Sequence, residues 1–229
     1  MVAQYIILIL EAGGVTLRLA FTSLIIATVI GLACALWKTK NNRIISGLVS
    51  GYTLLARGIP DLVMMLFVFY SLPALVNAGF ERYGSDYTFE ISPFVAGVAT
   101  LGFILGAYMT GTFYNALINI ARGELEAAQA YGFSRLQIFS AIILPQLIRL
   151  SLPGFTNNWL VLIKATALVS LLGLEDLMSR ARSAAEATGQ PFTFYLLAGA
   201  FYFVVSLLSV VILKYLTKKY ASGIRVVKI

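Results

Sequence analysis

Three charged side chains in apolar surroundings are the strongest candidates for chemistry in this sequence. Arg57 and Asp61 stand four residues apart, and Lys164 is the one charge between Leu150 and Leu174. If these stretches cross a membrane, each charge costs at least about 2.5–3.5 kcal/mol on insertion scales, so such residues either neutralise one another or face a water-filled path. Arg57 and Asp61 can pair at this spacing. Alternatively, Asp61 lines a path and meets a cationic group there.

The backbone between the first two charges is expected to break. Gly58 and Pro60 lie there, and proline removes a helical hydrogen bond. Lys164 lies 14 residues beyond Leu150, which is about 21 Å along a helix. That depth is large for a snorkelling lysine unless the helix begins well before Leu150. A structural counter-charge and a group that faces a carboxylate therefore both stay open for Lys164.

Uncharged polar residues and glycines indicate where helices contact one another. Asn158, Thr166 and Ser170 share the apolar stretch of Lys164, and we expect some of them to bond across helices. Gly102 and Gly106 have the Gly-x-x-x-Gly spacing that lets another helix approach closely, within one chain or between two.

Composition indicates a membrane protein. Of the 229 residues, 59% are hydrophobic and 12% are charged, and the mean hydropathy is +0.87, whereas soluble domains carry about twice that charge. The absence of histidine excludes Ser-His nucleophilic sites and zinc helices built on histidine pairs, and the single cysteine, Cys34, excludes an intrachain disulfide. Met1 to Leu10 carry no basic residue, so we expect the first apolar stretch to be retained rather than cleaved.

The whole chain is predicted to be one all-α membrane domain, residues 1–229, with five spans. Their approximate bounds are 13–37, 58–80, 93–116, 150–174 and 190–214. If the N-terminus is outside, the inner segments hold 11 basic residues and the outer segments hold 4, so the positive-inside rule favours N-out and C-in. The inner basic residues are Lys38, Lys40, Arg43, Arg122, Arg135, Arg149, Lys214, Lys218, Lys219, Arg225 and Lys228. Topology thus explains the net charge of +7, and nucleic acid is not expected as a partner.

One inner loop, residues 119–149, is too long for a simple helix connection. Good helix formers run from Glu124 to Tyr131 and are followed by Gly132, the place of a left-handed C-cap glycine. Ser134 and Gln137 then have capping-box spacing, which predicts a second helix. The loop is therefore predicted to be a helix-turn-helix, either resting on the bundle's own face or gripped by a soluble partner.

The spacing in this loop resembles the EAA loop of binding-protein-dependent ABC importers. The residues that carry the resemblance are Glu126, Ala127, Ala128, Gly132, Ile142, Leu144 and Pro145. Other stretches, such as Arg57-Gly-Ile-Pro-Asp61 and Lys164 to Gly173, resemble permease subunits of the polar amino-acid subfamily, closest to those for histidine and for lysine, arginine and ornithine. The likeness covers about Gly13 to Leu216. Many relatives have an acid directly after the matching lysine, whereas this chain has Ala165.

The resemblance implies a type I importer permease in a bacterial inner membrane, without catalytic residues of its own. It implies a second permease subunit, identical or a sister, two ATPase subunits that hold ATP and Mg²⁺ and receive the EAA helices, and an extracytoplasmic amino-acid-binding protein. The chain itself has no Gly-x-x-x-x-Gly-Lys-[Ser/Thr] loop, and no cofactor is expected in it. Candidates for the path are Arg57, Asp61, Asn158, Lys164, Thr166 and Ser170.

Other classes of function remain as alternatives at this point. The importer could carry other polar amino acids, such as glutamine or glutamate, rather than basic ones. A self-sufficient secondary carrier often shows inverted repeats, and five spans do not divide into two equal halves. A membrane enzyme with a carboxylate pair would need a second acid within a span beside Asp61.

Overall fold

The protein is a bundle of helices. The computed structural model describes residues 2–40 and 42–220, and these residues contain helices and no strand. In chain order the α-helices are α1 Val2–Thr39, α2 Arg43–Gly58, α3 Asp61–Leu66, α4 Leu72–Arg82, α5 Pro93–Ile118, α6 Arg122–Ala130, α7 Arg135–Ile138, α8 Leu144–Ala165, α9 Leu177–Thr188 and α10 Pro191–Tyr220. Five helical runs within the described residues are long and apolar enough to span a membrane. The five predicted spans therefore correspond to helices, although several bounds differ.

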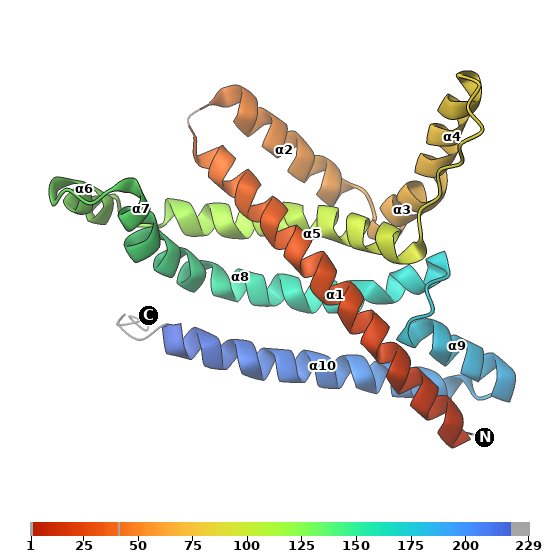
Figure 1. Cartoon of the computed structure of the whole chain (residues 1–229). Helices are drawn as coiled ribbons and strands as arrows, with labels where there is room; N and C mark the ends of the chain where they lie inside the picture. The colour runs from red at the N-terminus through yellow and green to blue at the C-terminus, as the bar shows by residue number, and fades with distance from the viewer. Residues whose placement is uncertain (1, 41, 221–229) are drawn as a thin grey trace.

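α5 forms the centre of the bundle, with α1 crossing it on one side and α8 and α10 beyond (Figure 1). Within its most apolar stretch 67% of α5 is buried, against 6% for α10, so α10 lies at the periphery. Small residues allow the crossing of α1 over α5. A Cβ on Gly102 would lie 2.7 Å from the Ile26 side chain, and one on Gly106 would lie 2.9 Å from the Ile30 side chain. The Gly-x-x-x-Gly pair thus serves packing within one chain.

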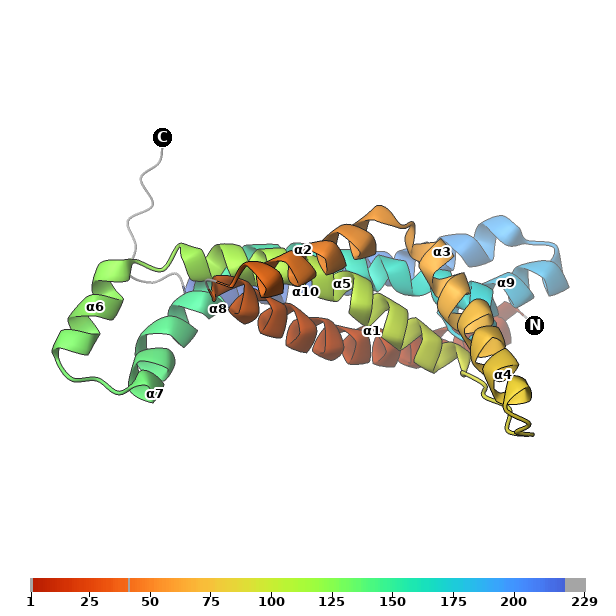
Figure 2. The ribbon, with the colours of Figure 1, turned by 90° about the horizontal axis from the view of Figure 1, so that it is seen from above.

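The helix break predicted between Arg57 and Asp61 is present, directly before the second long apolar helical run. Asn42 caps α2 by accepting from the amides of Ile44 and Ile45. α2 ends at Gly58, and Pro60 becomes the N-cap of α3. α3 and α4 then turn away from the bundle, so that α4 projects from it in both views (Figures 1 and 2).

Two prolines widen a helix instead of ending it. π-helical turns at Phe67–Ser71 and Phe139–Ile143 directly precede Leu72-Pro73 and Leu144-Pro145. Proline cannot donate to the carbonyl four residues back, and the wider turn relieves its clash with that carbonyl. A continuous helical run therefore extends from Arg135 to Leu172. We expected the fourth span to begin near residue 150, and the structure begins that helix inside the predicted loop.

The two ends of the bundle differ in what covers them. α6 and α7 lie at one end, which we call the loop end, and α9 lies at the other, which we call the α9 end (Figures 1 and 2). α1 starts at the α9 end, and α10 runs back to the loop end. A second apolar cluster, which includes Ile9, Leu177 and Phe194, fixes α9 against α1 and α10. Of the basic residues counted for topology, Arg225 and Lys228 lie outside the described residues.

Candidate functional site

A polar cavity of about 620 Å³ opens between α2, α5 and α8. Its lining combines one guanidinium, a phenol, a hydroxyl and three carboxamides with small residues, and no carboxylate is found among the described residues that line it. The lining residues are Arg57, Tyr108, Gly111, Thr112, Asn115, Ala116, Asn119, Leu150, Gly154 and Asn158. Such a mixture of polar groups around a hollow suits a small polar solute rather than a lipid chain.

Arg57 is held against α5 by backbone and ring contacts. Its Nη2 donates to the Ala107 carbonyl oxygen at 2.7 Å, and its guanidinium carbon lies 4.7 Å from the centroid of the Tyr108 ring. Gly111 leaves the space for this approach, since a Cβ there would lie 2.9 Å from Nη2. Arg57 and Asp61 form no ion pair in the described part of the chain. The guanidinium has five N–H donors, so most of them remain for a ligand.

Asn158 joins α8 to α5 at the wall of the cavity. Its amide nitrogen donates to Thr112 Oγ1 at 3.1 Å and lies 3.5 Å from Met109 Sδ. Gly154 lets the two helices approach, because a Cβ there would lie 2.7 Å from the Thr112 methyl carbon. The expected interhelical hydrogen bond of this residue is therefore present, and the same residue faces the cavity.

The remaining path candidates lie outside this cavity. Asp61 is half-buried in the first turn of α3, where the helix dipole favours a carboxylate. Lys164 is exposed in a groove of about 490 Å³ between α8 and α10, lined also by Tyr202 and Ser206. Because its helical run begins at Arg135, Lys164 sits near the α9 end of that run rather than at its middle.

Thr166 and Ser170 are buried and satisfied by their own helical turn. The Thr166 hydroxyl donates to the Ile163 carbonyl oxygen at 2.6 Å, and the Ser170 hydroxyl donates to that of Ala167 at 2.8 Å. Neither residue lines the polar cavity. The structure thus brings Arg57 and Asn158 together and leaves the other four candidates elsewhere.

Three polar residues of α5 and its C-cap residue also line the cavity and were not predicted as site residues. Tyr108, Thr112, Asn115 and Asn119 line the cavity from one helix face. Their separations of four, three and four residues are those of a single helical stripe, so a polar stripe inside an apolar span was the available signal.

The predicted helix-turn-helix forms the loop end. α6 closes with the two hydrogen bonds of a Schellman motif, from Gly132 N–H to the Gln129 carbonyl and from Phe133 N–H to the Ala128 carbonyl, both at 3.0 Å. Gly132 has φ of +78°. Ser134 and Gln137 make the expected capping box at the start of α7.

This element exposes several large apolar side chains. Tyr131 is 85% exposed and Leu136 is 76% exposed, so these side chains do not rest on the bundle. Glu126, Ala127, Leu144 and Pro145 are exposed as well, whereas Ala128 is buried. A hydrogen bond of 2.5 Å from Gln146 to the Glu124 carboxylate ties α6 to the start of α8. Of the two possibilities for the loop, this exposure favours one that is gripped by a partner.

Known proteins are similar to this chain over nearly its whole length. The family described as binding-protein-dependent transport system inner membrane component matches residues 27–222. The histidine/lysine/arginine/ornithine transport system permease protein HisQ of Escherichia coli K12 is 44% identical over 95% of each chain. The arginine ABC transporter permease protein ArtQ of the same organism is 36% identical, covering 89% of this chain and 91% of that one.

Solved structures show the same fold. A chain from the crystal structure of an amino acid ABC transporter with histidines superposes with a TM-score of 0.78 at 28% identity, over 95% of this chain and 96% of that chain. A chain of the MetNI methionine ABC transporter shares the fold, with a TM-score of 0.69 at 19% identity, over 93% of this chain and 96% of that chain. With five apolar helices, the chain is a multi-pass protein of the bacterial inner membrane. It belongs to the family of binding-protein-dependent transport system inner membrane components, with the type I ABC importer permease fold.

Proposed function

We propose that this chain forms half of the translocation path of an ATP-driven importer for basic amino acids: arginine, lysine, ornithine or histidine. The observation that carries the proposal is the near full-length identity of 44% to HisQ, which is named for these four amino acids. The 36% identity to ArtQ, named for arginine, supports the same class.

The polar cavity is the place in the chain where such a solute would bind. The free N–H groups of Arg57 suit the α-carboxylate of an amino acid, since a guanidinium binds a carboxylate through two parallel hydrogen bonds. The carboxamides of Asn115 and Asn119 can accept from an ammonium or guanidinium group. Asp61, just beyond the break after α2, would supply negative charge along the path for the cationic side chain. Lys164 would border another part of the path, nearer the α9 end, and the buried residues Thr166 and Ser170 would pack behind its wall.

The partners follow from the same proposal. The exposed helix-turn-helix of α6 and α7, with Glu126, Ala127, Ala128, Gly132, Leu144 and Pro145, would dock on an ATPase subunit that holds ATP and Mg²⁺. The loop end is then cytoplasmic, and the N-terminus is outside, where an amino-acid-binding protein delivers the solute. A second permease subunit, identical or a sister, would complete the path. Neither catalysis nor a cofactor is assigned to this chain.

Uptake by the assembled complex tests the proposal. The complex is reconstituted in liposomes with its binding protein and given labelled arginine, lysine, histidine, glutamine or glutamate, with and without ATP. We expect uptake of the basic amino acids that needs both ATP and the binding protein. If only glutamine or glutamate is taken up, the importer carries these amino acids rather than basic ones. Uptake without ATP would favour a secondary carrier.

A further inference from the structure

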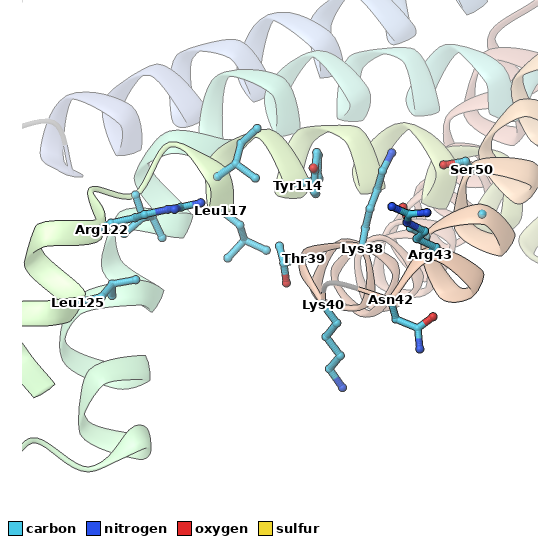
Figure 3. A pocket seen from close by; sticks show the side chains of 14 residues that line it. Lys38, Thr39, Lys40, Asn42, Arg43, Ser50, Tyr114, Leu117, Arg122 and Leu125 are labelled. Carbon is cyan, nitrogen blue, oxygen red and sulfur yellow. The ribbon is translucent and has the colours of Figure 1, made fainter.

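A basic pocket of about 1040 Å³ lies at the loop end, apart from the polar cavity (Figure 3). It is formed by the last residues of α1 and α5, the first half of α2 and the start of α6. Lys38, Lys40, Arg43 and Arg122 line it, and no acidic residue is found among the described residues that do so. The four cations form no ion pair with the described part of the chain.

Three of the cations line the hollow from two sides. Figure 3 shows Lys38 and Arg43 toward one side of the pocket and Arg122 toward the other, whereas Lys40 points away. The Lys38 ammonium is fixed 4.9 Å from the centroid of the Tyr114 ring. The nearby carboxylate of Glu124 accepts a hydrogen bond from Gln146 of α8 and is not part of the lining. The lining is therefore basic and without a carboxylate, which favours an anion.

The same pocket also has apolar and hydroxyl-bearing walls. Leu117, Ile118 and Leu125 line it together with Ser46 and Ser50. Ile118 is 56% exposed at its edge, at the end of a helix that spans the membrane. A ligand that binds here would thus meet cations on one side and apolar surface on the other. A phospholipid at the membrane interface, with an anionic headgroup and apolar chains, matches these surroundings.

We propose that this pocket binds the headgroup of an anionic phospholipid of the inner leaflet. Basic pockets between membrane helices on the cytoplasmic side bind anionic headgroups in this way. The positive-inside rule accounts for cations at this end of the bundle, but it does not require three of them to face one hollow. The inference rests on the proposed orientation of the loop end and is independent of the amino acid that is carried.

Trp37 offers a reporter, because it is 50% exposed and directly precedes Lys38. The assembled complex is placed in nanodiscs of phosphatidylcholine that contain rising fractions of dibrominated phosphatidylglycerol or dibrominated phosphatidylcholine. Bromine quenches nearby tryptophan fluorescence, and the signal of Trp37 is isolated as the difference between the wild type and Trp37→Phe. Each cation close to an anionic headgroup contributes about fivefold in affinity, so phosphatidylglycerol should quench at a mole fraction at least about tenfold lower than phosphatidylcholine.

Charge variants then test the pocket itself. In the triple variant Lys38→Gln, Arg43→Gln and Arg122→Gln, the mole fractions of the two brominated lipids that give half-maximal quenching should differ by no more than about twofold. Lys214→Gln, which removes an exposed cation of α10 outside the pocket, should keep the full preference. An equal loss in Lys214→Gln, or an unchanged preference in the triple variant, would overturn the proposal.

Two further experiments distinguish a lipid headgroup from other occupants of the pocket. Inorganic phosphate and sodium chloride, at matched ionic strength, should weaken the preference equally; a loss with phosphate alone would indicate a soluble phosphate site and overturn the proposal. Because the assembled complex carries its ATPase subunits, the preference should be present while they are bound. If the complex shows no preference for phosphatidylglycerol, the lipid assignment is wrong. Impaired amino-acid uptake with intact lipid preference would count against the proposed function and not against this site.

Discussion

Gly132 gives the most direct test of the shape of the loop end. It is the C′ residue of the Schellman motif that ends α6, and its φ of +78° lies in the left-handed region. A Cβ added there would meet nothing within 4 Å. Within this chain a Cβ at Gly132 therefore has room, and the substitution acts on the chain through the backbone conformation.

The magnitude follows from the cost of that conformation. The left-handed region costs an L-residue about 1–2 kcal/mol, Asn adopts it more readily than most, and β-branched residues adopt it least readily. A cost of 1–2 kcal/mol changes the population of the turn by about 5–30-fold. We therefore expect coupling to decrease in the order Gly132, Gly132→Asn, Gly132→Ala, Gly132→Val.

The assay compares ATP-driven uptake with ATPase activity in proteoliposomes. Gly132→Val should insert and assemble, but hydrolyse ATP with little uptake. Gly123→Val is a matched control in the same loop, because its Cβ also meets nothing within 4 Å and its φ is not positive. If all three substitutions at Gly132 behave like the wild type, or if Gly123→Val is as severe as Gly132→Val, the role assigned to the turn is wrong.

Three further predictions address charge, topology and pH. Asp61→Asn should reduce arginine and lysine uptake by well over tenfold, since loss of a desolvated ion pair costs a few kcal/mol, while ATP hydrolysis persists; unchanged uptake would make Asp61 a purely structural residue. In a Cys34-free background, Ser85→Cys should react with an impermeant thiol reagent from outside and Ser134→Cys should not, and the reverse pattern would invert the topology. Burial raises the pKa of Asp176, the N-cap of α9 outside the spans, to about 6. The folded chain then holds a proton that the unfolded chain loses between about pH 4 and 6, so stability should fall as pH rises through that window. Asp176→Asn, which keeps the cap, should flatten this slope in thermal unfolding; an equal slope in the variant would assign it to another group.

Local signals predicted the loop end and the spans well. Gly132, Ser134 and Gln137 fixed the turn and the cap, because these interactions lie within a few residues of one another. The break at Gly58 and Pro60 was likewise local. Long apolar runs identified the five spans because the bilayer demands a minimum length.

Long-range contacts were not predictable in the same way. The partner of Arg57 is the Ala107 carbonyl, a backbone group that no pattern of charged side chains reveals. The sequence did not reveal that the helix of the fourth span begins at Arg135, because it gave no sign of the π-turn at Phe139–Ile143 that carries the helix through Pro145. Lys164 consequently lies nearer the end of its helix than its distance from Leu150 suggested.

The central claim is that a basic amino acid passes through the polar cavity. It is tested most directly by asking whether the substrate protects a cavity residue from alkylation. Asn115 is exposed and lines the cavity, whereas Ile118, one turn further along α5, lines the basic pocket instead. Each is replaced by cysteine in a Cys34-free background, and the rate of alkylation is measured in the assembled complex with arginine, with glutamine and without a solute. Arginine should slow the alkylation of Asn115→Cys and leave that of Ile118→Cys unchanged, and glutamine should slow neither. Equal rates at Asn115→Cys with and without arginine, in a complex that still takes up arginine, would contradict the assignment of this cavity to the path.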